Sequence, residues 1–211
     1  MFLYTFLLGR PGCGKSVIYR TLAERVKREG LADDVVRIDD FPVLEELLAE
    51  DVEHKRHVRK EGGFEVTDFS ILDDVLKRIN QKLKELRKPH RLIFVEFSRD
   101  RYTRALGNFD REVLDRSLII YIYCPFELCL KRNKRRFEEK RVAVDDHIVP
   151  TDLMYKYYRY DDYEELFLES EDALQRQAPT RLVVVKNDLE GLDKLVGELE
   201  KVVTALKEYK N

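Results

Sequence analysis

Residues 9–16 read Gly9-Arg10-Pro11-Gly12-Cys13-Gly14-Lys15-Ser16, which has the G-x-x-x-x-G-K-S spacing of a phosphate-binding loop. An apolar run at residues 2–8 precedes the loop and has the composition of a buried strand. Residues 15–29 follow it with apolar side chains three and four positions apart, which predicts a helix. A strand, a glycine loop and a helix in this order form the context that the motif requires, so the sequence predicts a P-loop.

The residue types of the loop suit a bound phosphate. Glycines allow backbone N–H groups to approach phosphate oxygens without a side-chain clash, and the following helix directs its positive end toward the anion. We expect Lys15 to reach the outer phosphates and the Ser16 hydroxyl to hold Mg²⁺. The predicted nucleotide-binding residues of the loop and its flanks are Gly9, Pro11, Gly12, Cys13, Gly14, Lys15, Ser16 and Val17.

The composition narrows the class of protein. The 211 residues fit one domain, the 44% hydrophobic content supports a sizeable core, and a net charge of -2 gives no global attraction to nucleic acid or membrane. The cysteines, Cys13, Cys124 and Cys129, are odd in number and lack metal-site spacing, which favours a reducing compartment. The apolar start is too short for a secretion signal, and no stretch reaches membrane-spanning length. We therefore expect a cytoplasmic protein with no membrane partner.

Apolar runs alternate with helical patterns along the chain. The predicted strands are residues 2–8, 35–38, 91–97, 118–124 and 181–186. The predicted helices are residues 15–29, 42–54, 70–87, 126–140, 151–168 and 189–209. The strand at 118–124 is almost entirely apolar, which indicates burial on both faces. We therefore predict one α/β domain over residues 1–211, with a parallel sheet covered by helices.

Two stretches are longer than plain crossovers between strands. Residues 41–89 are interpreted as a helical, substrate-side insertion, with Gly62-Gly63 as its best loop signal. Residues 133–178 are interpreted as a lid followed by a helical cover, and the lid region is assigned to residues 131–150.

Carboxylates stand at the ends of two predicted strands. Asp39 and Asp40 end the second strand, where open parallel sheets bind ligands. Asp39 is the favoured candidate for the base that accepts the proton of a substrate hydroxyl, or for a magnesium ligand. A cap on the next helix is the alternative. Glu96 ends an apolar strand, where an unpaired charge is costly, so we expect it near Mg²⁺ or substrate rather than in a simple salt bridge.

Basic side chains are concentrated in residues 131–141. Arg132 and Arg136 are four positions apart on one helical face and are predicted to clamp the transferring phosphoryl group. A nucleic-acid patch and a solvated charged helix are the alternatives. One of Arg99, Arg101 and Arg104 is expected to meet an anionic substrate.

The remaining polar clusters are given structural roles. Tyrosines gather at residues 155–163, where packing is favoured over stacking on a base. His147 has too few neighbouring ligands for a metal site.

Together these motifs resemble the P-loop kinase family, which includes nucleoside, nucleotide and small-molecule kinases. The loop at residues 9–16 matches that family, and Asp39-Asp40-Phe41-Pro42 is similar to the D-D-F-Y segment of uridine- and pantothenate-type kinases, with Pro42 in place of tyrosine. Residues 123–132 resemble the segment leading into the lid. Residues 147–154 are similar to the region after the lid in zeta-toxin-like and seryl-tRNA-kinase-like kinases. Asn187 resembles a base-contacting loop residue of guanylate-type kinases.

The resemblance implies a three-layer P-loop NTPase fold with a five-stranded parallel core, the cofactors ATP and Mg²⁺, and transfer of the γ-phosphoryl group. Lys15 would bind phosphate, Ser16 would hold Mg²⁺, Asp39 would be the base, and Arg132 and Arg136 would belong to the lid. The expected acceptor is a small molecule, with a nucleoside or nucleotide favoured.

Other nucleotide-binding classes fit the sequence less well. A GTPase would carry N-K-x-D after a late strand, and an ABC-type ATPase would carry a signature such as L-S-G-G-Q; the chain has neither. Two alternatives stay open: an ATP-binding regulatory protein with little turnover, and a kinase that acts on an RNA or protein acceptor.

Overall fold

The computed structural model describes residues 3–60, 63–138, 149–188 and 192–208. The strands are β1 (Tyr4–Leu8), β2 (Asp34–Asp39), β3 (His57–Lys60), β4 (Gly63–Val66), β5 (Arg91–Phe97), β6 (Ser117–Tyr123) and β7 (Leu182–Lys186). The helices are α1 (Lys15–Arg28), α2 (Asp40–Glu50), α3 (Ile71–Leu86), α4 (Tyr102–Leu106), α5 (Arg111–Leu114), α6 (Phe126–Glu138), α7 (Thr151–Tyr157), α8 (Asp162–Glu169), α9 (Glu171–Gln177) and α10 (Leu192–Glu208).

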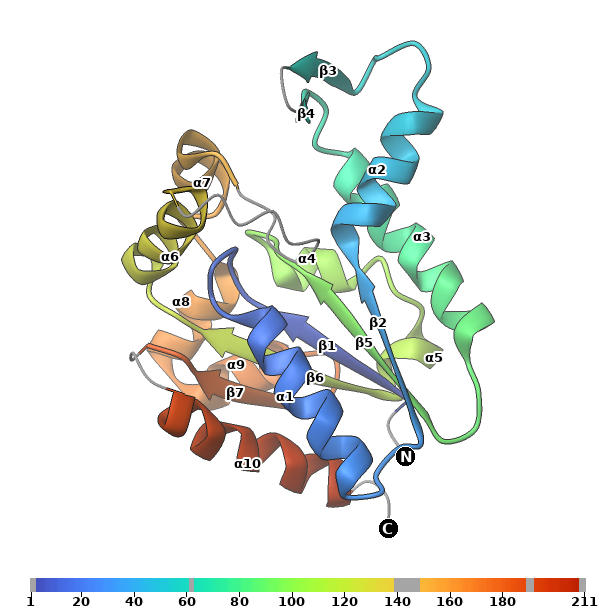
Figure 1. Cartoon of the computed structure of the whole chain (residues 1–211), viewed down its shortest axis with the longest axis vertical. Coiled ribbons are helices and arrows are strands. Elements are labelled where there is room, and N and C mark those ends of the chain that lie inside the picture. Colours follow the sequence, from blue (N-terminus) through green and yellow to red (C-terminus); the bar gives the residue numbers. More distant parts are fainter. Residues whose placement is uncertain (1–2, 61–62, 139–148, 189–191, 209–211) are drawn as a thin grey trace.

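The main sheet has five parallel strands in the order β2-β5-β1-β6-β7 (Figure 1). Its strands include the five that the sequence predicts, with boundaries shifted by two residues at most. β1 lies at the centre, so the P-loop that follows it opens at the middle of the carboxyl edge of the sheet. The predicted parallel α/β fold is confirmed.

Side chains of the central strands alternate between two buried faces. In β1, Tyr4, Phe6 and Leu8 enter one core cluster, whereas Leu7 enters the other. The same alternation runs through β5 and β6, and these side chains are almost completely buried. Because successive strand residues point to opposite faces, an apolar run without polar interruption needs cover on both sides.

Helices supply that cover in two layers. On one face, the core cluster includes buried residues of α1, α6, α7 and α10. On the other face it includes residues of α2, α3, α4, α5, α8 and α9. In Figure 1 α1 crosses in front of the sheet, and α10 runs below it beside β7. The result is the three-layer arrangement that the sequence predicts.

The segment between β2 and β5 forms an arm that projects beyond the sheet (Figure 1). It contains helices α2 and α3, as expected for the insertion at 41–89, and also an antiparallel hairpin of β3 and β4 that the sequence reasoning missed. The two strands have four residues each, which is too short to show an alternation of apolar and polar side chains. Of the predicted glycine loop, Gly62 lies outside the described residues and Gly63 begins β4. Ion pairs Lys82–Glu46 (2.6 Å) and Arg78–Glu50 (3.0 Å) join α2 to α3.

The single helix predicted at residues 151–168 is wrong, because two helices, α7 and α8, occupy this stretch. Asp161 starts the second one, since its side chain accepts hydrogen bonds from the backbone of Tyr163 and Glu164. Such a cap satisfies the first free N–H groups of a new helix and defines its beginning. Ser170 begins α9 in the same way, by accepting from the N–H of Ala173.

Part of the predicted lid cannot be compared, because residues 139–148, His147 among them, lie outside the described residues. The beginning of the lid region belongs to α6, and Val149 returns to that helix through two hydrogen bonds with Asn133, of 2.6 and 3.2 Å. Among the described residues, no helix is both long enough and apolar enough to cross a membrane.

Candidate active site

Gly12 and Gly14 hold the P-loop in left-handed backbone conformations that favour glycine. Gly12 has φ 85°, and a Cβ added there would lie 2.5 Å from the carbonyl oxygen of Cys129. Gly14 has φ 102°, and a Cβ there would collide with the Asn187 side-chain amide. Residues with a Cβ rarely adopt such φ values, and at Gly12 the neighbour is backbone, which leaves no room for a methyl group. These glycines therefore let the loop backbone approach α6 and the loop after β7.

Lys15 is buried and surrounded by acceptors. Its ammonium group donates to the carbonyl oxygens of Gly9 (2.9 Å) and Arg10 (3.1 Å) and to the hydroxyl of Ser98 (2.7 Å). Ser98 in turn donates to Gly9 O at 2.8 Å. The lysine is thus held beneath the loop by the first residue after β5.

One cavity of about 140 Å³ lies at the carboxyl edge of the sheet, beside the loop. Its lining includes many of the residues predicted for the site: Pro11, Gly12, Gly14, Lys15, Ser16, Asp39, Glu96 and Arg136. The cavity therefore joins the loop, the ends of β2 and β5, and α6. The arm contributes Asp40 and an apolar wall of Phe41, Leu44, Leu72 and Val75.

Five other predicted residues lie outside that lining: Gly9, Cys13, Val17, Arg132 and Asn187. Gly9 supports the loop from behind, since its N–H donates to the Tyr102 hydroxyl at 2.8 Å. The Cys13 carbonyl accepts from the Asn187 amide at 2.7 Å, and Val17 packs against the apolar core on the α1 face.

Asp39 and Glu96 are brought together by strand register. They are direct partners on the parallel strands β2 and β5. Arg37 lies between them, with Nη2 2.7 Å from Asp39 Oδ2 and 2.9 Å from Glu96 Oε2. Asp39 also accepts from the N–H of Phe41 at 3.0 Å and so caps α2. Asp39 therefore both caps α2, as the alternative interpretation predicted, and lines the cavity.

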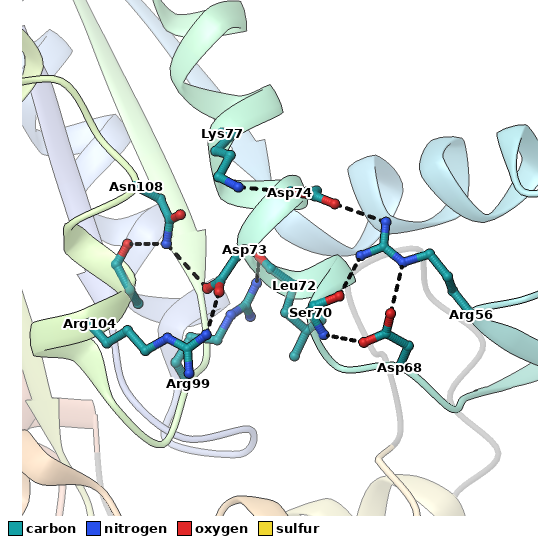
Figure 2. A network of polar contacts seen from close by, with 11 residues as sticks. Arg56, Asp68, Ser70, Leu72, Asp73, Asp74, Lys77, Arg99, Arg104 and Asn108 are labelled. Carbon is teal, nitrogen blue, oxygen red and sulfur yellow. Dashed lines mark hydrogen bonds and ion pairs between the residues drawn. The ribbon is translucent and has the colours of Figure 1, made fainter.

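The neighbouring carboxylate, Asp40, is tied to the end of β5. Arg99 donates to Asp40 Oδ2 at 2.6 Å and to the Leu72 carbonyl of α3 at 3.2 Å. Figure 2 shows Arg99 beside the first turn of α3, where Arg104 also pairs with Asp73. Of the three arginines after β5, Arg99 alone lines the cavity; Arg101 and Arg104 have exposed side chains.

Burial sets the electrostatics of the acidic groups. Removal from water raises the pKa of Glu96, and the charges of Lys15 and Arg37 act against that rise. Burial likewise raises the pKa of Asp40, opposed by the Arg99 cation. Both carboxyl groups therefore depend on adjacent cations for their ionised form.

Arg132 and Arg136 of α6 do not act at one point. Arg136 lines the cavity, whereas Arg132 donates to the Asn187 carbonyl at 3.3 Å and to the Cys124 sulfur at 3.4 Å. Arg132 and Asn187 therefore form a second group, which contacts the P-loop through Cys13 but does not line the cavity. The helical spacing of four predicted that both arginines share a face but could not say which neighbours each one meets.

The donors around the loop fit a magnesium ion. Ser16, Asp39 and Glu96 offer only oxygen atoms, the ligands that Mg²⁺ prefers, and Mg²⁺ usually takes one or two carboxylates plus water and phosphate. Glu96 Oε2 is buried without an aligned hydrogen bond. Among the described residues, no group of three or more His, Cys, Asp or Glu side chains could hold a metal ion by itself. The residues therefore suit an ion that arrives with phosphate ligands.

Sequence reasoning missed several contributors to the site. Arg10 occupies a variable position of the motif, yet its buried guanidinium donates to Tyr158 O (2.7 Å), Arg159 O (3.1 Å) and Glu164 (2.5 Å). Tyr158 lines the cavity, although the tyrosine-rich segment was assigned to packing. For Ser98 a signal existed, because it directly follows a strand that ends at the predicted ligand edge. Arg10 and Tyr158 carry no comparable local signal.

A sequence model for a family described as an AAA domain matches residues 8–149, which spans the P-loop, the arm and α6. The chain belongs to this family. No curated protein matches the chain.

Solved structures share the fold over nearly the whole chain. Kti12 from Chaetomium thermophilum, in complex with ADP-AlF3, is 16% identical, with 96% of this chain and 98% of that chain covered and a TM-score of 0.57. A gluconokinase from Sinorhizobium meliloti 1021 is 15% identical, with 100% and 99% covered and a TM-score of 0.53. Shikimate kinase from Acinetobacter baumannii, in complex with shikimate, is 18% identical, with 99% and 95% covered and a TM-score of 0.51. The chain thus has the fold of P-loop kinase-like NTPases, as the resemblance implied.

Proposed function

We propose that this protein is an ATP-dependent kinase that transfers the γ-phosphoryl group to a small acceptor. The observation that carries this proposal is the shared cavity, in which Lys15 and Ser16 of the P-loop face Asp39 and Glu96 at the ends of β2 and β5. A phosphate cradle beside a carboxylate base is the minimum that phosphoryl transfer to a hydroxyl requires.

On the phosphate side, the loop backbone and Lys15 bind the phosphates of ATP. Lys15 exchanges part of its contacts with loop carbonyls for phosphoryl oxygens. Ser16 and Glu96 would hold Mg²⁺, which would supply positive charge to the transferring group. Arg136 lies across the cavity and stabilises the same charge.

On the acceptor side, Asp39 takes the proton of the attacking hydroxyl. The acceptor oxygen forms a bond to the γ-phosphorus while the bond from that phosphorus to the bridging oxygen breaks, and ADP leaves with the bridging oxygen. Asp39 is held for this role by the Phe41 N–H and by Arg37. Arg132 and Asn187, which lie outside the cavity, border the nucleoside part of ATP.

The acceptor that we propose is a nucleoside or nucleotide. The cavity wall pairs apolar side chains of the arm with the buried Arg99, and Phe41 and Tyr158 offer aromatic faces for a base. The gluconokinase and the shikimate kinase are named for hydroxy acids, so hydroxy acids form the second class of candidate acceptor.

Measurement of ATP consumption with Mg²⁺ tests the proposal. The acceptor panel contains nucleosides, nucleoside monophosphates, small alcohols, hydroxy acids and 5′-hydroxyl RNA, and Lys15→Ala is the control. Acceptor-dependent turnover that disappears in Lys15→Ala supports a kinase and names the acceptor class. ATP binding without turnover on any acceptor contradicts the proposal and favours a regulatory nucleotide-binding protein.

A further inference from the structure

Arg37 has a second contact, with Glu96, that the kinase proposal does not use, because there Arg37 only holds Asp39. It lies two residues before Asp39 on β2, and Asp39 is the register partner of Glu96 on β5. Side chains two residues apart on a strand share a face, and register partners on adjacent strands do so too. All three side chains therefore project from the same face of the sheet, and each is less than one-fifth exposed.

A single nitrogen of Arg37 serves both carboxylates. Nη2 lies 2.7 Å from Asp39 Oδ2 and 2.9 Å from Glu96 Oε2. The contact to Glu96 is an ion pair without an aligned hydrogen bond, since Glu96 Oε2 is buried and has no hydrogen-bond partner. Arg37 thus acts toward Glu96 chiefly as a positive charge.

The guanidinium is held there from the other side by α1. Its central carbon lies 5.2 Å from the centre of the Tyr19 ring, a cation–π distance. Tyr19 in turn packs edge-on against Phe94 of β5, with ring centres 5.3 Å apart. Arg37 is therefore fixed between α1 and the carboxylate pair.

The Asp39–Glu96 pair requires a positive charge between its two carboxylates. Two carboxylates on neighbouring strands repel each other, and the repulsion is stronger when both are largely removed from water. A divalent cation between the carboxylates would satisfy the same need, but it cannot share the position with the Arg37 nitrogen.

We infer that Arg37 is the resident counter-ion of the Asp39–Glu96 pair and competes with divalent cations for it. Arg37 is a positioning residue that acts through the two carboxylates. Without nucleotide, its charge keeps the divalent cation out; phosphate oxygens add the ligands that allow the ion to bind. This inference rests on the magnesium role in the proposed function, but its test needs no phosphoryl transfer.

The test is a titration of the nucleotide-free protein with Mn²⁺ as the probe, in which free Mn²⁺ is followed by its paramagnetic resonance signal. Arg37→Gln should bind Mn²⁺ at least about tenfold more tightly than the wild type. Arg37→Lys keeps the positive charge and should stay close to the wild type. The double variant Arg37→Gln/Glu96→Gln should lose the gain, because it removes one carboxylate of the pair.

Arg91→Gln is a matched control at the other end of the same two strands. Arg91 of β5 pairs with Asp34 of β2 at 2.5 Å, far from the P-loop edge, so its removal should leave Mn²⁺ affinity unchanged. Thermal unfolding verifies that each variant is folded. If Arg37→Gln does not fold, Arg37→Met, which keeps the apolar stem beside Tyr19, is measured instead.

Unchanged or weaker Mn²⁺ binding by a folded Arg37→Gln or Arg37→Met protein overturns the inference. A gain that survives loss of Glu96 also overturns it, because the ion then binds elsewhere. Tighter Mn²⁺ binding in a protein that phosphorylates none of the acceptors leaves the inference standing and removes the proposed function. If the protein transfers phosphoryl groups but the Arg37 variants show no gain in Mn²⁺ binding, the proposed function stands and this inference is overturned.

Discussion

The two sides of the cavity are built differently. The side that we propose for phosphate consists mainly of backbone: a loop shaped by Gly12 and Gly14, with Lys15 bound to the loop's own carbonyl oxygens. The opposite side, which we propose for the acceptor, depends on charged side chains at the ends of β2 and β5, where Arg37 lies between Asp39 and Glu96 and Arg99 pairs with Asp40.

Because of this difference, the two sides should be sensitive to different kinds of substitution. The backbone cradle depends on conformations that a side chain would block, so it is sensitive to steric change. The acceptor side depends on charge balance among buried groups, so it is sensitive to isosteric changes of charge. Variants on the two sides should therefore fail in different ways.

The largest effect is expected from Lys15→Ala on the phosphate side. Acceptor-dependent ATP consumption should fall to background, because a preorganised donor to a transition-state oxygen contributes roughly 100- to 1,000-fold to kcat. Lys27→Ala, at the exposed end of the same helix α1, is the control and should retain wild-type turnover. Substantial turnover by Lys15→Ala would mean that the P-loop is not the phosphate site.

The next effect, on the acceptor side, separates chemistry from binding. Asp39→Asn should lower kcat by about 100-fold or more while ATP affinity, measured by calorimetry, stays near the wild-type value. Asparagine also caps helices, so α2 keeps its start. Asp34→Asn, at the opposite end of β2, should leave both quantities unchanged. A near-full rate in Asp39→Asn would show that the base assignment is wrong.

A smaller effect tests whether a side chain at Gly12 is excluded by steric contact or by the φ angle alone. Gly12→Ala combines a left-handed φ with a 2.5 Å approach to the Cys129 carbonyl, whereas Gly30→Ala has φ 64° and open space around it. Chemical denaturation should show a loss of about 3 kcal/mol for Gly12→Ala and about 1 kcal/mol for Gly30→Ala. Equal losses would contradict a steric role for the contact between the loop and α6.

The smallest effect concerns Asp161, the buried residue that caps α8. Burial raises the pKa of Asp161 to about 7, so the folded protein holds this proton more tightly than the unfolded chain does. The free energy of unfolding should therefore decrease as pH rises through the range between about 4 and 7, by about 1 kcal/mol between pH 6 and pH 8.

Asp161→Asn should lose this slope while it keeps the cap on α8, since the amide oxygen still accepts from Tyr163 and Glu164. Denaturation of both proteins at pH 6 and pH 8 measures the difference. A slope that is the same in both would assign the pH dependence to other groups.

Sequence reasoning succeeded where structure is local. The five parallel strands followed from continuous apolar runs, and the loop from eight consecutive residues. It failed at the β3–β4 hairpin, because four-residue strands carry little periodicity. It also failed at the break between α7 and α8, because an aspartate within a helical pattern cannot be recognised as a cap from the pattern alone.

The same division holds within the site. The sequence by itself determined the position of the glycine loop and the two strand-end carboxylates, because backbone conformation and strand position follow from neighbouring residues. Only the tertiary structure decided the partners: Arg37 for Asp39 and Glu96, Arg99 for Asp40, and Arg10 for the segment before α8. Those pairings depend on which strands are neighbours and in what register, and on how the helices pack against them. A charged side chain shows no such preference until the fold has brought its partner within reach.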